Sequence, residues 1–402
     1  MSRPVLTVDG VDVSCVALPQ VSVTVGRESV DTQPSASVLS ARILGWAGAG
    51  EVGAPVVFSD TDGRMFGGAV TDLDCEHMTG DDWETRLVAT GPLADLGRRV
   101  VGDVPWPEES DSARVARILT LADAPHAVDP DIVGPLVLAR DVDAQPALML
   151  AQGVADDALG VLWEQPADPV TPVRYLPARS RSWVTPSPSW AEVDDAVLWS
   201  GTGETTWADS AAVPGAQRPG ELTIRCEECA ADVTFSQRIG DVIRTVVLLY
   251  GPDAEPRASV VMGSGGPQRR VDTQLADLSG ATEVAGALWR ARHGVAWRLQ
   301  GLRLRLDLLG AARRSQIRGA LAVGTRLTVS LPVSSPVGTS WQGYVEGWDL
   351  DVDGDAQLLT LRVSDRSLTE PADMWADVPA GTTWADAGPV AWVDAIDFGG
   401  AV

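Results

Sequence analysis

Residues 66–74 read Phe-Gly-Gly-Ala-Val-Thr-Asp-Leu-Asp, and residues 341–349 read Trp-Gln-Gly-Tyr-Val-Glu-Gly-Trp-Asp. Both stretches have the same order: an aromatic residue, any residue, glycine, any residue, valine, two further residues, a large apolar residue and aspartate. A strand-like segment precedes each, Gly53 to Val57 in the first case and Gly324 to Thr328 in the second. The repeat predicts two related β modules in one chain, and chance similarity between two β-hairpins is the alternative.

The repeat also has a consequence for assembly. Three copies of a chain that holds two similar modules present six modules around an axis, which matches a trimer to a sixfold tube. Gly68 and Gly343 are expected where another backbone comes close to the strand, since glycine has no Cβ. With Phe66, Trp341 and Trp348, they are our interface candidates within the repeat.

The remainder of the first hundred residues favours short strands. Val21 to Val25 repeats with period two, as one buried face of a strand does. Asp9-Gly10 and Asp62-Gly63 are typical hairpin turns. Many short strands separated by glycine and aspartate predict a barrel or a sandwich. The predicted fold class is therefore mainly β (α+β), with two related β-barrels.

Three helices interrupt this pattern. Asp111 or Ser112 is a candidate N-cap for the first, and Asp143 for the second, with Gly160 as its stop. A third is expected over residues 281–292. The Pro- and Ser-rich stretch from Trp183 to Pro219 predicts long loops.

We therefore divide the chain into four parts. Residues 1–106 form a first β-barrel, 107–213 an inserted α/β domain with long loops, and 214–365 a second β-barrel with one helix. Residues 366–402 are an extended tail, too short for a core of its own. Tryptophan buries a large area with little loss of rotamer freedom, so this tail is expected to dock onto a neighbouring chain or domain. Its anchors are Trp375, Trp384 and Trp392.

Composition limits the function classes. The 402 residues exceed what one core usually serves. The net charge of -24 repels nucleic-acid phosphate and disfavours sequence-specific DNA binding. We expect no signal peptide and no membrane-spanning segment, because no stretch is apolar enough.

Two motifs suggest metals, and each is incomplete. Cys226-Glu-Glu-Cys229 is half of a zinc site, but two further ligands at matching spacing are missing. Residues from Asp349 to Gly354 match the start of a calcium loop, yet Thr360 stands where the bidentate acid belongs, which favours a hairpin tip. No Ser-His-Asp arrangement stands out. We therefore predict no catalytic residues and no cofactor, with both metals as minor alternatives.

The sequence resembles the minor tail proteins of actinobacterial siphophages, in their tail-hub class. That class is similar in architecture to the baseplate hub of contractile tails and to the hub half of type VI secretion spikes. Gly263 to Pro267 departs from the pattern. The resemblance rests on these stretches: Ala36 to Leu44, Val56 to Val70, Trp83 to Gly91, the helix from Ser112, Gln145 to Trp163, Asp272 to Leu275, Gly324 to Leu331, Trp341 to Trp348, Leu359 to Asp365, and Thr383 to Asp386.

The resemblance implies a homotrimer at the distal end of the tail tube, in the virion, after assembly in the host cytoplasm. Its implied partners are the distal tail protein ring, the C-terminus of the tape measure protein, and further minor tail or fibre proteins. Genomic DNA would pass through its channel. Two alternatives stay open: a hexameric distal tail adaptor ring, and a carbohydrate-binding or hydrolytic module acting on the cell envelope.

Overall fold

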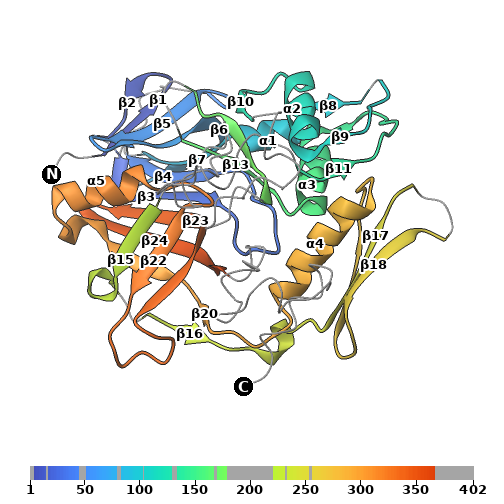
Figure 1. Cartoon of the computed structure of the whole chain (residues 1–402). Helices are drawn as coiled ribbons and strands as arrows, with labels where there is room; N and C mark the ends of the chain where they lie inside the picture. Colours follow the sequence, from blue (N-terminus) through green and yellow to red (C-terminus); the bar gives the residue numbers. More distant parts are fainter. Residues whose placement is uncertain are drawn as a thin grey trace, which may run out of the picture.

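The computed structural model describes residues 4–14, 17–44, 51–78, 83–102, 104–128, 134–166, 170–178, 221–230, 233–252 and 256–366. One large sheet of twelve strands organises this part of the chain (Figure 1). Its strands are β1 (Val5–Val8), β2 (Val11–Asp12), β3 (Ala17–Gly26), β4 (Val38–Leu44), β5 (Pro55–Asp60), β6 (Gly63–His77), β7 (Trp83–Thr90), β15 (Glu221–Arg225), β21 (Leu302–Arg305), β22 (Arg326–Ser330), β23 (Ser340–Asp353) and β24 (Ala356–Asp365).

The strands follow the order β15-β22-β23-β3-β4-β7-β6-β5-β1-β2, with β24 paired to both β23 and β21. The mainly β fold class is thereby confirmed. The two predicted barrels are not confirmed, because the pairing of the described strands does not close into a ring. The reason is that β3, a strand of the first module, pairs with residues 347–353 of β23, a strand of the second module. This pairing makes the two modules one continuous sheet.

One core underlies the whole sheet. It contains apolar side chains from the N-terminal strands and from β21 to β24 alike. The period-two alternation explains this: Val21, Val23 and Val25 of β3 are buried, while the residues between them point to the other face. The four-part division of the chain stays a prediction, and the structure adds that both modules bury their side chains together.

The insertion has a separate core around α1 (Pro92–Leu96), α2 (Asp111–Leu121) and α3 (Ala147–Asp157). Two expected caps are corrected. Ser110 caps α2, because its hydroxyl accepts a hydrogen bond from the Ala113 N–H at 3.2 Å. Helix α3 begins after Pro146 and not near Asp143. Its short strands are β8 (Val100–Val101), β9 (Glu109–Ser110), β10 (His126–Ala127), β11 (Leu136–Val137), β12 (Gln145–Pro146), β13 (Val161–Glu164) and β14 (Val173–Leu176).

Glu164 connects this insertion to the large sheet. Its carboxylate is 1% exposed and accepts hydrogen bonds from the backbone N–H groups of Ser37, at 2.7 Å, and of Leu93. The side chain leaves no room beside Gly91, where an added Cβ would lie 2.1 Å from a carboxylate oxygen. Burial raises the pKa of Glu164 to about 7, against the lowering effect of these hydrogen bonds.

A third core lies under β17 (Thr245–Tyr250), β18 (Ala258–Gly263), β19 (Gln268–Asp272) and α4 (Leu278–Arg290). These elements were expected inside the second barrel, but they form a three-stranded sheet covered by α4 (Figure 1). A further helix, α5 (Ala311–Gly319), packs against the tip of the β5–β6 hairpin. Two ion pairs hold it there, Arg314 with Asp62 and Arg318 with Asp60. Two more short strands, β16 (Phe235–Ser236) and β20 (Arg298–Leu299), pair with each other.

Candidate functional site: a strand pair that occurs twice

The two sequence stretches that match each other also match in strand register. In the first module, β6 pairs with β5 so that Gly68 faces Val56. In the second, β23 pairs with β22 so that Gly343 faces Leu327. Each of the two glycines therefore occupies the same position relative to the strand before it.

Each strand pair also carries a bulge at the same place. Against β7, the register of β6 shifts after Val70, and against β24 the register of β23 shifts after Val345. The bulged residues are Thr71 and Glu346. A bulge bends the strand and increases its twist, so both modules change direction at equivalent residues.

The loop that enters each module is fixed in the same way. The Gly53 N–H donates to the carbonyl oxygen of Val70 at 2.8 Å, and the Gly324 N–H donates to that of Val345 at 2.8 Å. Both glycines have positive φ, +95° and +85°, which favours glycine. Both modules therefore begin with glycine for the same reason: the residue that donates to the valine carbonyl has a positive φ.

The close approach predicted for the two strand glycines is confirmed. A Cβ added to Gly68 would lie 2.2 Å from the carbonyl oxygen of Thr90, and one added to Gly343 would lie 2.1 Å from that of Ser364. Such contacts are far shorter than van der Waals distance, so only glycine fits. The two environments are alike, which argues against chance similarity between two hairpins.

The aromatic candidates lie inside the chain. Phe66 is fully buried, and Trp341 and Trp348 are nearly so. Their role at an interface stays a prediction. Because these side chains are buried, they would influence a neighbouring chain only by shaping the strand pair that it contacts. The tail candidates lie outside the described residues, and these are Trp375, Trp384 and Trp392.

The bulged residues give the modules different chemistry. The Thr71 hydroxyl donates a hydrogen bond to the carbonyl oxygen of Val88, at 3.2 Å. The Glu346 carboxylate instead accepts a hydrogen bond from Arg27 Nε at 2.6 Å, and the side chains of this ion pair are 3% (Arg27) and 1% (Glu346) exposed. The Ser364 hydroxyl also donates a hydrogen bond to Glu346. Sequence reasoning missed this pair, because nothing local connects an arginine after β3 with a glutamate in β23.

The outer face of the sheet carries acidic residues at equivalent positions of both modules. Asp74 and Glu76 of β6 correspond to Asp349 and Asp351 of β23 in the repeat. Cross-strand neighbours place Asp351 and Asp72 on the same face, through one residue each of β3, β4 and β7. Burial, and the nearby carboxylate of Asp349, raise the pKa of Asp351.

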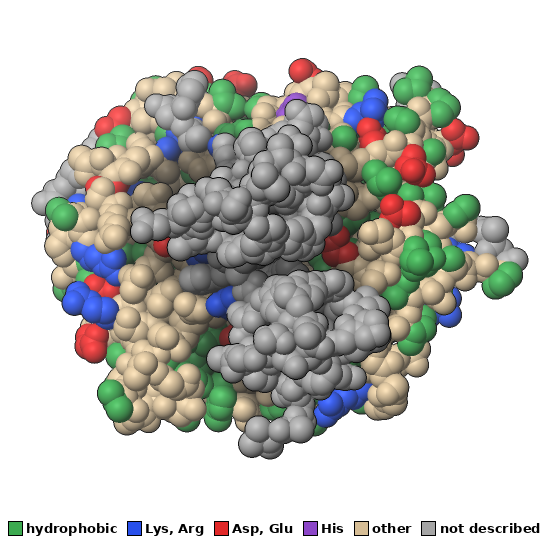
Figure 2. All heavy atoms as spheres, in the orientation of Figure 1, with side chains coloured by type: hydrophobic (Ala, Val, Ile, Leu, Met, Phe, Trp, Pro, Cys, Tyr) green, Lys and Arg blue, Asp and Glu red, His purple; other side chains and the backbone are tan. Residues whose placement is uncertain are grey.

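Between these rows, the face is hollowed and bears paired charges. A depression of about 540 Å³ is lined by residues of β3, β4, β23 and β24, among them Ser22, Ser40 and Asp351. Beside it, Arg42 forms two hydrogen bonds with Glu84, whose pKa is lowered by the guanidinium. On the side of the molecule seen in Figure 2, described acidic and basic side chains are likewise interspersed.

The metal motifs take ordinary structural positions. Cys226 lies in a 3-10 turn, and burial raises the pKa of the Cys229 thiol to about 11. Asp349 to Asp353 belong to β23 and lead into a turn where Gly354 has a φ of +60°. Within the described ranges, no group of three or more His, Cys, Asp or Glu residues could hold a metal ion. None of the described helices is long and apolar enough to span a membrane.

Neither a protein-family model nor a curated protein matches the sequence. The structure does resemble solved structures. One is the 43 kDa tail protein of prophage MuSo2 from Shewanella oneidensis, with a TM-score of 0.60 and 9% identity, covering 92% of this chain and 100% of that one. Another is the tail protein from Neisseria meningitidis MC58, with a TM-score of 0.59 and 10% identity, covering 92% and 99%.

A third similar structure is the E. coli c3393 protein, a component of the type VI secretion system that is itself described as similar to the T4 tail proteins gp27 and gp5. Its TM-score is 0.51 at 10% identity, covering 91% of this chain and 79% of that one. At such identities the similarity shows the fold alone. The described part of this chain therefore has a fold similar to that of phage tail proteins.

Proposed function

We propose that this protein is a structural component of a phage tail tip, a homotrimeric hub that closes the distal end of a siphophage tail tube. The tail-protein fold supports the first part of this proposal. The hub part is carried by one observation, the strand pair that occurs twice in the same register with the same bulge.

The duplication would match the symmetry of a tail tube. A tail tube has sixfold symmetry, and three copies of this chain would present six equivalent strand pairs to it. The modules share one sheet and one core, so their relative placement within a copy is rigid. Such a rigid pair suits a ring better than two modules on a linker, because no flexible segment has to be ordered on binding.

The acidic rows support a channel role. Asp74 and Asp349, and likewise Glu76 and Asp351, would recur around the axis at six similar positions. Carboxylates repel phosphate, so a lumen lined by this face would let DNA pass without binding it. In this proposal the protein binds the distal tail protein ring, fibre or other minor tail proteins, and the C-terminus of the tape measure protein. It has no catalytic role, and it is assembled in the cytoplasm of an actinobacterial host and carried in the virion.

The experiment is a measurement of the oligomer. The purified chain is analysed by native mass spectrometry, and tail tips containing it are imaged by electron microscopy. A trimer located at a threefold tip supports the hub. A hexamer at a sixfold position would overturn it in favour of a distal tail adaptor ring. Hydrolysis or pull-down of cell-wall material by the same preparation would favour an envelope-acting module.

A further inference from the structure

A cavity of about 340 Å³ lies away from the repeated strand pairs. It is bounded by the loop that follows β3, the C-terminal end of α3, strand β19 and helix α4. Its volume falls in the range of small-ligand sites, roughly 300–1,000 Å³. Elements of all three cores therefore meet around one partly open cavity.

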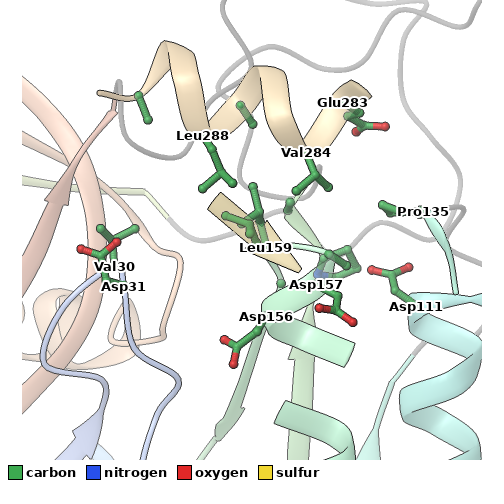
Figure 3. Close-up of a pocket in the computed structure, with 18 of the residues that line it drawn as sticks. Val30, Asp31, Asp111, Pro135, Asp156, Asp157, Leu159, Glu283, Val284 and Leu288 are labelled. Carbon is green, nitrogen blue, oxygen red and sulfur yellow. The ribbon is translucent and has the colours of Figure 1, made fainter. Parts of the chain in front are cut away.

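The walls of the cavity differ in character. Figure 3 shows Val284 and Leu288 of α4 on one side, with Leu159 facing them, and the carboxylates of Asp157 and Asp111 on the other. An apolar wall opposite carboxylates fits a side chain that has an apolar stem and a cationic end. Arginine and lysine are the side chains with both.

The arginines in the lining are already engaged. Arg269 forms an ion pair with Asp31 at 3.5 Å, and Arg292 also pairs with Asp31. Arg27 is held by Glu346. These guanidinium groups are directed to other carboxylates and do not neutralise the carboxylates at the end of α3.

Asp156 and Asp157 have neutral hydrogen-bond donors. Asp156 accepts from the side-chain amide of Gln33 at 2.9 Å, and Asp157 accepts from the backbone N–H of Gln274 at 3.0 Å. Both stand at the C-terminal end of α3, where the helix dipole is negative and disfavours a carboxylate. Burial raises the pKa of Asp157 to about 6, although the guanidinium groups of Arg140 and Arg257 act in the opposite direction and offset part of this effect. A cation from outside would relieve this unfavourable arrangement.

A second group in the lining, the guanidinium of Arg27, has an N–H donor that is not satisfied within the described residues. Arg27 is 3% exposed, and its Nη2 has no hydrogen-bond acceptor among the described residues. A buried guanidinium N–H without an acceptor is costly, by about 1–3 kcal/mol or more for a charged group. A peptide carbonyl is the neutral acceptor that would satisfy it.

We propose that this cavity binds a peptide segment of a neighbouring protein through one arginine or lysine side chain. The cationic end lies against the carboxylate of Asp157, across the cavity from α4. The stem packs on Leu159 and Leu288, and a main-chain carbonyl of the segment accepts from Arg27. This site is independent of the hub proposal, because it requires neither a trimer nor a tail tube.

The test uses the full chain and two tripeptide probes that differ in one group. Acetyl-Gly-Arg-Gly-amide carries the guanidinium, and the same peptide with citrulline carries a neutral urea of equal shape. By calorimetry, the arginine peptide is expected to bind with a Kd of about 1 mM or tighter. The citrulline peptide should bind at least about tenfold more weakly, a difference of about 1.4 kcal/mol.

Two variants locate the site. Asp157→Asn keeps an acceptor for Gln274 and should lower the affinity for the arginine peptide about tenfold. Asp353→Asn removes an exposed carboxylate of the outer sheet face and should leave that affinity unchanged. If Asp157→Asn does not fold, Asp156→Asn at the exposed neighbouring position replaces it. Equal binding of both peptides, unchanged binding by the cavity variant, or no binding of the arginine peptide would overturn the proposal.

Discussion

Arg27 and Glu346, 319 residues apart in the chain, form an ion pair of 2.6 Å in which both side chains are almost fully buried. Glu346 is the bulged residue of β23, and Arg27 directly follows β3. The ion pair therefore joins the two modules at the place where the pairing of β3 with β23 ends.

Removing one partner of this pair should be strongly destabilising. Arg27→Ala leaves Glu346 as a buried charge without its cation, and such changes cost about 3–5 kcal/mol. The free energy of unfolding from urea titration measures this. Arg86→Ala is the matched control, because its contacts with Glu76 and Glu84 are made by a guanidinium that is 60% exposed and should matter by less than about 1 kcal/mol. Equal losses in the two variants would contradict a special role for the buried pair.

The two strand glycines should respond alike to substitution. Gly68→Ala and Gly343→Ala each place a Cβ against a backbone carbonyl that a side-chain rotation cannot move, so each should lose more than about 2 kcal/mol of stability. Gly153→Ala is the control. That glycine lies in α3 with open space around it, and alanine there should be neutral or stabilising by up to about 1 kcal/mol. A tolerated substitution at only one of the two strand positions would show that the modules are not equivalent.

Glu164 should make stability fall as the pH rises through the weakly acidic range. Its pKa in the folded protein is about 7, above the ordinary value of 4.5, so between these values the folded state binds more protons than the unfolded state. The stabilisation is complete below about pH 4.5 and is lost by about pH 7, with a size on the order of 3 kcal/mol. Asp157 acts in the same direction.

The variant Glu164→Gln isolates this contribution. It replaces the group that titrates with one that does not, so the slope of unfolding free energy against pH should flatten between about pH 5 and 7. Urea titrations of both proteins at several pH values give the two slopes. An unchanged slope would assign the pH dependence to other groups.

The C-terminal tail should be required for assembly. Deleting residues 370–402 removes Trp375, Trp384 and Trp392, and the oligomer is expected to lose mass or to fail to bind its neighbours. Alanine at the three tryptophans should have the same effect as the deletion. Trp83→Ala, at an exposed position of β7, tests the loss of a tryptophan elsewhere and should leave assembly intact. Unchanged assembly of the truncated chain would count against docking by the tail.

Several features followed from the sequence because their causes are local. The alternation in Val21 to Val25 predicts a half-buried strand, and β3 is one. Asp9-Gly10 and Asp62-Gly63 predict hairpin turns, and both occur between paired strands. The helix ends were less well predicted. Ser110, Asp111 and Ser112 can all cap a helix, and in the structure Ser110 is the N-cap of α2. After α3, the residue with a left-handed backbone is Leu159, with a φ of +56°, and not Gly160.

What the sequence by itself determined is the duplicated strand pair, because the repeated order of aromatic residue, glycine and valine reflects contacts within one module. Only the tertiary structure decided that the modules share a single sheet, that Arg27 meets Glu346, and that a cavity lies beside α3 and α4. These features depend on which strand edges and helix faces meet across hundreds of residues. Local periodicity carries no information about that choice, since any free edge can pair with any other.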